Sequence, residues 1–121
     1  MRIFLALLAP LALAAPSPTP LHTANFTIQV AAGETKTIDF AIPPRFAGGP
    51  RQITFTWQIV RPRPAPRFMF MEQCIDPERC NRSIMPPTGQ GTGTLQSVFR
   101  IVNAGGVGVD VQIRYALWEV R

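Results

Sequence analysis

Histidine is almost missing from this chain of 121 residues, since His22 is the only one. A serine or cysteine nucleophile activated by an imidazole would have to use that single residue. It stands beside the proline-rich stretch PSPTP rather than among other reactive side chains. No glycine-rich phosphate loop between a strand and a helix is present either. The sequence therefore predicts a protein that is not an enzyme, with no catalytic residue and no cofactor.

Long apolar runs are missing after residue 15. The first fifteen residues, MRIFLALLAPLALAA, combine a basic start at Arg2, an apolar stretch from Ile3 to Leu13 and the small-x-small pattern of Ala12-Leu13-Ala14. These features are typical of a signal peptide, residues 1–14, cleaved after Ala14. An uncleaved N-terminal anchor is the alternative. We expect a secreted or periplasmic protein with no membrane span in the mature chain.

Cysteine is scarce, because Cys74 and Cys80 are the only two. In an exported chain, an even number of cysteines predicts a disulfide, which here ties a short loop that includes Pro77. The Cys-x-x-Cys spacing of redox enzymes is absent, and a zinc site needs further ligands. We therefore predict no metal at the cysteines.

Lysine is nearly absent as well, and arginine supplies almost all the positive charge behind a net charge of +5. No acidic residue lies between Asp39 and Glu72, a stretch that contains Arg61, Arg63 and Arg67. Such a patch attracts an anionic envelope component or an acidic protein; the alternative is a solvated loop. No aromatic residues alternate with these arginines, so we expect no nucleic-acid binding.

Helical periodicity is missing after the signal peptide, and a period of two takes its place. Six segments alternate apolar and polar residues or read as short strands: 25–30, 35–42, 53–60, 68–74, 94–102 and 107–120. Strands with one apolar face each can bury it by packing as two sheets. After a proline-rich leader, residues 15–24, we predict one domain, residues 25–121. Its fold is an all-β, single antiparallel immunoglobulin-like β-sandwich of about six to seven strands, with a small barrel as the alternative.

The segment FMFMEQC has two apolar faces if it is a strand, because phenylalanines alternate with Met69 and Met71. Either the strand is covered on both sides, or the thioethers bind Cu(I) together with Met85 or His22. From Ile75 to Gly93 the pattern predicts an irregular connection that ends in a glycine-rich loop.

The last third of the chain, GQGTGTLQSVFRIVNAGGVGVDVQIRYALWEV, resembles the end of chagasin-type cysteine-protease inhibitors, and AGETKTIDFAIP followed by Trp57 is similar to their first hairpin. The resemblance implies an immunoglobulin-like sandwich. It also implies that three segments at one end block a protease cleft: the loop before Trp57, the Gly89 to Gly93 loop and the segment around Trp118. The chain departs from the family in three places. PPRFAGGPR replaces the Asn-Pro-Thr-Thr-Gly loop, Ala116-Leu117 replaces Arg-Pro before the last tryptophan, and the cysteine-tied loop is extra. The chain also resembles Golgi-dynamics-type domains.

From these patterns we expect an exported, non-enzymatic binding or structural module of the cell envelope or extracellular space, whose partner is a protein or an anionic envelope component. An inhibitor of papain-type cysteine proteases is the first alternative, and a periplasmic copper-binding protein is the second. The expected contact residues are the exposed tryptophan, the glycine-rich loop and the basic loop: Trp118, Gly89, Gly91, Gly93, Arg61, Arg63 and Arg67.

Overall fold

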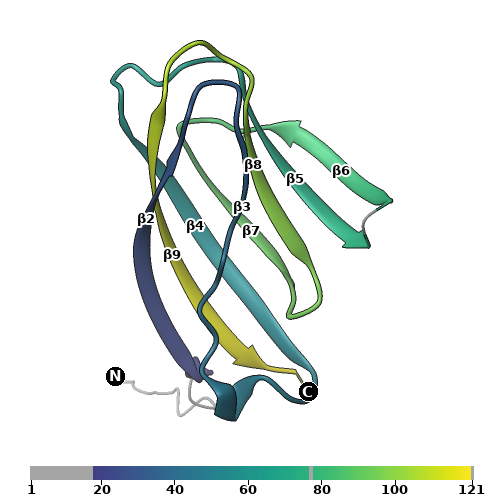
Figure 1. The fold of residues 1–121 in the computed structure, drawn as a ribbon. Coiled ribbons are helices and arrows are strands. Elements are labelled where there is room, and N and C mark those ends of the chain that lie inside the picture. The colour runs from purple at the N-terminus through teal and green to yellow at the C-terminus, as the bar shows by residue number, and fades with distance from the viewer. Residues whose placement is uncertain (1–17, 77, 121) are drawn as a thin grey trace, which may run out of the picture.

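The computed structural model describes residues 18–76 and 78–120 and shows two packed antiparallel β-sheets (Figure 1). The predicted signal peptide, residues 1–14, lies outside the described residues. The first sheet has the strand order β2-β9-β4-β7 and the second sheet has the order β3-β8-β5-β6. The strands are β2 (His22–Val30), β3 (Thr35–Thr37), β4 (Arg51–Arg61), β5 (Met69–Asp76), β6 (Arg79–Ile84), β7 (Thr88–Thr94), β8 (Val98–Asn103) and β9 (Val109–Glu119).

The predicted β-sandwich is confirmed, and its core follows from the alternation in the sequence. The central strands β4 and β9 place every second side chain between the sheets, where they are buried. These inward residues are Ile53, Phe55, Trp57 and Ile59 on β4, and Val109, Val111, Ile113, Tyr115 and Leu117 on β9. Each buried methylene group stabilises the fold by about 0.8 kcal/mol, so this stripe supplies much of the driving force.

Two strands lie where we predicted an irregular connection, and the expected number of strands was therefore too low. The structure forms β6 within residues 75–93 and begins β7, which ends at Thr94, in the same stretch. Every residue of β6 is exposed, and β7 contains three glycines, so neither strand carries the apolar alternation by which we recognised the others. In Figure 1, the β5–β6 hairpin projects away from the body of the sandwich.

Two strand boundaries also differ from the prediction. Strand β2 begins at His22, three residues before the expected start of the domain, because residues 22–24 pair with the end of β9. The predicted strand 35–42 ends at Thr37, opposite Arg100 of β8; one further backbone hydrogen bond follows, from the N–H of Ile38 to the carbonyl of Phe99 at 2.8 Å.

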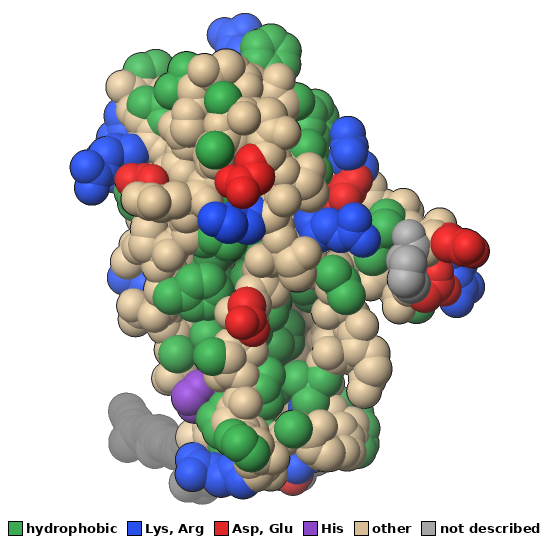
Figure 2. Space-filling view, viewed as in Figure 1, with side chains coloured by type: hydrophobic (Ala, Val, Ile, Leu, Met, Phe, Trp, Pro, Cys, Tyr) green, Lys and Arg blue, Asp and Glu red, His purple; other side chains and the backbone are tan. Residues whose placement is uncertain are grey.

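The segment Ile38–Ile42, which we call the strap, still follows the predicted alternation. Ile38 is buried, and Phe40 and Ile42 pack against the core. The ring centroid of Phe40 lies 5.2 Å from that of Phe55 and 5.3 Å from that of Tyr115. Figure 2, which has the same view as Figure 1, shows hydrophobic side chains gathered on the lower half of the molecule, below the end of β3. The strap thus covers the part of the first sheet that the shorter second sheet leaves open.

The Tyr115 side chain anchors the strap to the first sheet. Its hydroxyl donates a hydrogen bond to the carbonyl of Ala41 at 2.9 Å and lies 3.4 Å from Nε2 of His22. Burial raises the pKa of Tyr115 above its usual value, and the negative charge of Asp39 adds to the shift. The single histidine of the chain is therefore part of a structural contact.

Candidate functional site

The two cysteines form the predicted disulfide. Cys74 on β5 pairs directly with Cys80 on β6, and their Cα atoms are 4.0 Å apart. The turn that joins the strands satisfies its own polar groups, since Asp76 accepts hydrogen bonds from the backbone N–H of Glu78 and from the Arg79 side chain. These two donors hold the pKa of Asp76 below its usual value. The disulfide and the hydrogen bonds of the turn thus hold the two strands of the β5–β6 hairpin together.

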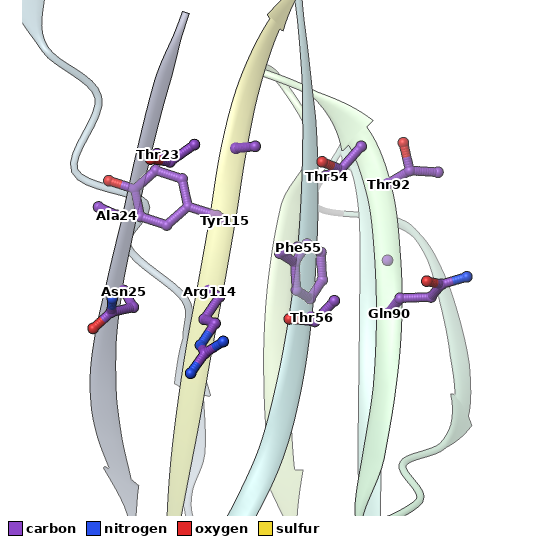
Figure 3. Close-up of a pocket in the computed structure, with 12 residues that line it drawn as sticks. Thr23, Ala24, Asn25, Thr54, Phe55, Thr56, Gln90, Thr92, Arg114 and Tyr115 are labelled. Atoms are coloured by element: carbon purple, nitrogen blue, oxygen red, sulfur yellow. The ribbon is translucent and has the colours of Figure 1, made fainter. Parts of the chain in front are cut away.

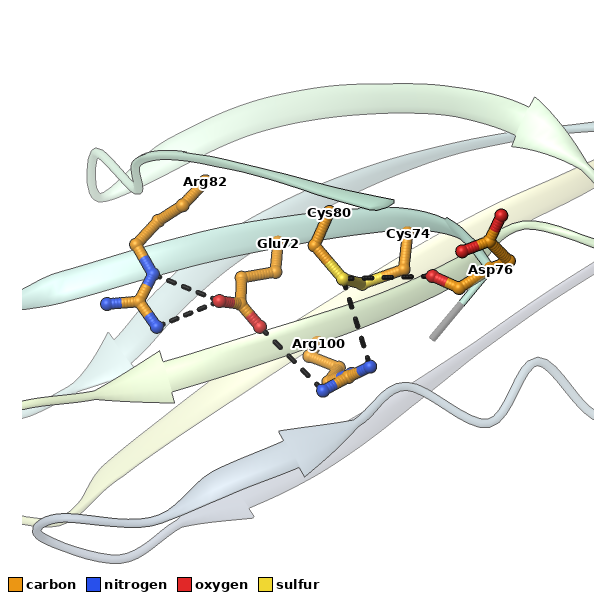
Figure 4. Close-up of polar contacts among 6 residues, drawn as sticks. All are labelled: Glu72, Cys74, Asp76, Cys80, Arg82 and Arg100. Carbon is orange, nitrogen blue, oxygen red and sulfur yellow. Dashed lines mark hydrogen bonds and ion pairs between the residues drawn. A yellow bond between two sulfur atoms is a disulfide. The ribbon is translucent and has the colours of Figure 1, made fainter. Parts of the chain in front are cut away.

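Charged groups on the outward face of the second sheet are paired with one another (Figure 4). The Glu72 carboxylate accepts two hydrogen bonds from Arg82, at 2.8 and 3.0 Å, and lies 4.0 Å from a guanidinium nitrogen of Arg100. Arg82 also lies over the ring of Phe70, 5.5 Å from its centroid. These contacts cross three neighbouring strands and tie β6 to the sheet.

The methionines of the suspected copper site belong to the hydrophobic core. Met69, Met71 and Met85 are at most 6% exposed and pack among core side chains. Met69 pairs with Asn103, whose amide donates to the carbonyl of Val30 at the far end of β2 from His22. Eight residues of strand separate the histidine from that end, which is about 27 Å. The structure does not bring His22 to the thioethers, and packing accounts for their burial.

The expected glycine-rich loop is strand β7, and its glycines face the core. Gly89 pairs with Trp57 and Gly91 pairs with Phe55. A Cβ atom built on Gly89 would lie 2.2 Å from the indole of Trp57, and one on Gly91 would lie 2.5 Å from the ring of Phe55. Gly93 faces Phe99 in the same way, at 2.8 Å. Glycine is required here because aromatic rings occupy the space of its side chains, which is a structural reason for the motif.

The arginines expected to bind anions lie at the end of β4 and in the loop between β4 and β5. Arg61, at the end of β4, is 3.4 Å from the carboxylate of Asp110. Arg63 and Arg67 are exposed. Asp110 and Trp118 lie near opposite ends of strand β9, and the eight residues of strand between them span about 27 Å. The basic loop and the tryptophan are therefore at opposite ends of the first sheet and do not form one site.

Trp118 lies on the outward face of the first sheet, as its position in the alternation predicted. Its inward neighbour Leu117 is fully buried, whereas the tryptophan is partly exposed. The indole N–H donates a hydrogen bond of 2.8 Å to the Thr54 hydroxyl on the adjacent strand β4. This bond fixes the indole across the sheet and leaves a rigid aromatic surface at one end of the face.

An open hollow of about 770 Å³ lies on the same outward face, across β2, β9, β4 and β7 (Figure 3). Strand alternation separates the lining residues into two groups. The side chains of Phe55 and Tyr115 are buried in the core, so these residues contribute only a floor. The walls are outward side chains, most of them exposed: Thr23, Asn25, Thr54, Thr56, Gln90 and Thr92.

Two wall hydroxyls of the hollow are held by hydrogen bonds. Thr54 accepts the bond from Trp118. The hydroxyl of Thr92 donates to the carbonyl of Ile53 and accepts a bond from the Gln52 side chain, at 3.3 and 3.1 Å. A threonine that accepts one bond still has an O–H to donate. The walls thus present hydroxyl groups in fixed positions, which lowers the entropy cost of binding.

The hollow is nearly neutral. Of the twelve described residues that line it, Arg114 alone is charged. Ala116 lies between Arg114 and Trp118 on the same face of β9, and its short side chain leaves the floor open. The combination of neutral donors and acceptors, one guanidinium and a nearby indole suits recognition of a polar ligand.

Sequence reasoning missed this hollow, although its signal was present. Threonine, asparagine and glutamine occupy outward positions in three segments, β2, β4 and β7. We read the first two as the polar faces of strands and the third as part of an irregular connection, and only the strand order shows that they adjoin around β9. Of the expected contact residues, Gly91 lines the hollow through its backbone, and Trp118 donates a hydrogen bond to Thr54 in the wall.

No family model matches the chain, and no curated protein matches its sequence. Among residues 18–76 and 78–120, no helix is long and apolar enough to cross a membrane. Within the same residues, His, Cys, Asp and Glu side chains form no group of three or more with the arrangement of a metal site.

Proposed function

We propose that the chain is an exported, non-enzymatic β-sandwich that binds a component of the cell envelope or the extracellular space. The observation that carries the proposal is the hollow on the outward face of the first sheet, whose walls are pre-positioned polar side chains. Ligand sites are usually concave and largely formed before the ligand arrives. The disulfide supports export, since such bonds persist in oxidising compartments.

Thermal melting in the presence of candidate ligands tests this proposal. The full chain is expressed, the exported protein is purified, and its mass reports whether cleavage followed Ala14. Neutral polysaccharides, anionic polymers and anionic vesicles are then added in turn. A ligand that binds the folded state raises the melting temperature, and the rise grows with the logarithm of the ligand concentration above its dissociation constant. We expect at least one class to do so.

Two variants locate the binding. Ala116→Leu fills the floor of the hollow and is expected to abolish the ligand-induced rise. Thr37→Val, on the outward face of the second sheet, is the matched control and keeps it. A rise that survives Ala116→Leu and disappears in Arg63→Gln would move the site to the basic loop. The absence of a rise with every class would contradict the proposed function.

Inhibition of papain-type cysteine proteases is a second candidate, and one feature of the fold favours it. Gln52 pairs with both Thr94 and Trp118, so the loop before β4, the β7–β8 turn and the end of β9 gather at one end of the sandwich. The turn stands in place of the expected Gly89 to Gly93 loop, whose glycines lie in strand β7. An inhibitor of this type needs three such segments together. Titration of papain with the exported protein tests this candidate: stoichiometric inhibition supports it, and unchanged protease activity at micromolar protein excludes it.

A further inference from the structure

The outward faces of the two sheets differ in charge. The second sheet presents Glu72, Arg82 and Arg100 together with the apolar Phe70. Most outward positions of the first sheet carry hydroxyl or carboxamide side chains instead, although the chain has 12 basic and 7 acidic residues. An ordinary solvated sheet face carries mixed charges. The first sheet therefore has a surface whose chemistry is set apart from the rest of the molecule.

The hydrogen-bonding capacity of this face indicates the class of ligand. The hydroxyls of the other wall threonines and the carboxamides of Asn25 and Gln90 can each both donate and accept hydrogen bonds, whereas the O–H of Thr92 already donates to Ile53. A ligand that carries hydroxyl groups offers the same two capacities, whereas a carboxylate or phosphate only accepts and is better matched by several cations. Arg114 is the single cation in the hollow. The face therefore matches a neutral, hydroxyl-rich molecule.

Three residues of β9 form a row along this face and make the candidate site elongated. Trp118, Ala116 and Arg114 point to the same side, and the first and last are four residues apart, which is about 14 Å. The fixed indole offers an apolar surface on which a sugar ring can lie, the alanine leaves room, and the guanidinium offers several N–H donors. The site is elongated and open, and suits a segment of a chain.

We infer that the outward face of the first sheet binds a neutral polysaccharide. Sugar rings pack on Trp118, and their hydroxyl groups bond to the threonine and carboxamide walls of the hollow. The inference rests on the proposed function and names the ligand class for the same site. An anionic polymer held by Arg114 is the competing occupant that the experiment separates.

Isothermal titration calorimetry of the exported protein with defined oligosaccharides tests the inference. The neutral probes are cello-, xylo- and chito-oligosaccharides, and the anionic probe is an oligogalacturonide. We expect at least one neutral probe to bind and the anionic probe to bind more weakly. Anionic binding that is lost in Arg114→Gln would overturn the inference while leaving the proposed function in place. If no probe binds even at millimolar concentration, the inference is overturned; if the melting assay is also flat, the proposed function fails with it.

Point variants report whether the named side chains carry the binding. Trp118→Ala should weaken it by about tenfold or more. Thr56→Val, which leaves the bond between Trp118 and Thr54 in place, should weaken it about three- to tenfold, the effect of one hydrogen bond. Arg114→Gln replaces the several N–H donors of the guanidinium with one carboxamide and should weaken neutral binding about three- to tenfold. Thr37→Val should leave affinity unchanged within about twofold. Because Trp118→Ala also removes the bond to Thr54, circular dichroism and Ala116→Leu accompany it. Full affinity in Ala116→Leu would overturn the assignment.

Discussion

Replacement of Gly91 by alanine tests the unusual contact between β7 and the aromatic core. The added Cβ would lie 2.5 Å from Cζ and 2.6 Å from Cε1 of Phe55. That ring is 2% exposed, and its centroid lies 5.2 Å from that of Phe40 and 4.8 Å from that of Phe99. Its neighbours prevent the ring from rotating away, so either the ring or the strand must move.

The expected loss of stability follows from these distances. Carbon atoms in contact prefer a separation of about 3.5–4.0 Å, so the clash requires a shift of about 1 Å. Overpacking of this kind costs about 1–3 kcal/mol. Replacing glycine inside a strand recovers about 0.5–1 kcal/mol of backbone entropy. We therefore expect Gly91→Ala to lower the free energy of unfolding by about 1 kcal/mol, or the melting temperature by about 4–8 °C.

A second glycine in the same chain is the matched control. No heavy atom lies within 4 Å of a Cβ built on Gly106, and its backbone φ is outside the left-handed region. Gly106→Ala should therefore be neutral or stabilise the fold by up to about 1 kcal/mol. Urea and thermal unfolding, followed by circular dichroism, compare the two variants. If Gly91→Ala is as stable as Gly106→Ala, the packing of β7 on the core rings is refuted.

Three further predictions concern stability. Asn103 is 1% exposed, and its side chain bonds to three backbone groups, so Asn103→Ala should cost about 2–3 kcal/mol in urea unfolding, whereas the exposed Asn81→Ala should change stability by less than about 0.5 kcal/mol. Serine at Cys74 and Cys80 should cost about 2 kcal/mol by the same measurement, and alkylation of the wild type without reductant should find no free thiol; labelling at both would contradict the disulfide. Because the pKa of Tyr115 is raised above 10 in the fold, its contribution to stability is full below pH 10 and is lost as the pH rises through the raised value. The phenolate absorbance of this single tyrosine should therefore appear at a higher pH in the folded protein than in the unfolded protein. Absorbance curves that rise at the same pH in both states would contradict its burial.

Strands with a strong apolar alternation could be predicted from sequence because the alternating apolar residues are the ones that the core buries. In β4 and β9, every expected inward residue from Ile53 to Ile59 and from Val109 to Leu117 is buried. Val107, with which the predicted segment 107–120 begins, lies before β9 and is 56% exposed. The strand starts later because its pairing with β2 begins opposite Val30.

Strand β7 was not predictable in the same way because its core-facing positions are glycines. The large side chains that normally mark such a strand are supplied by its neighbour, since Trp57 and Phe55 reach under Gly89 and Gly91. A sequence pattern reads one segment at a time, whereas this packing belongs to a pair of strands. The wrong assignment as a loop came from that limit.

The candidate site required the strand order as well as the pattern. The outward position of Trp118 was visible in the sequence, and the hollow beside it was not. Thr23, Thr54 and Thr92 are far apart in the chain and become neighbours only because β2 and β4 flank β9 and β7 flanks β4. Non-local pairing of this kind leaves no mark in any single segment.

The two tryptophans of the chain allow one direct test of the binding face. Their indole N–H groups lie in different places: that of Trp118 bonds to Thr54 on the outward face, and that of Trp57 bonds to the carbonyl of Pro86 at 2.9 Å. The measurement is a ¹H–¹⁵N spectrum of the exported protein during titration with a neutral oligosaccharide. We predict that the indole signal of Trp118 and the amide signals around the hollow shift together, while the indole signal of Trp57 stays in place. An unchanged Trp118 signal at saturation, or shifts confined to the basic loop around Arg63, would contradict the account.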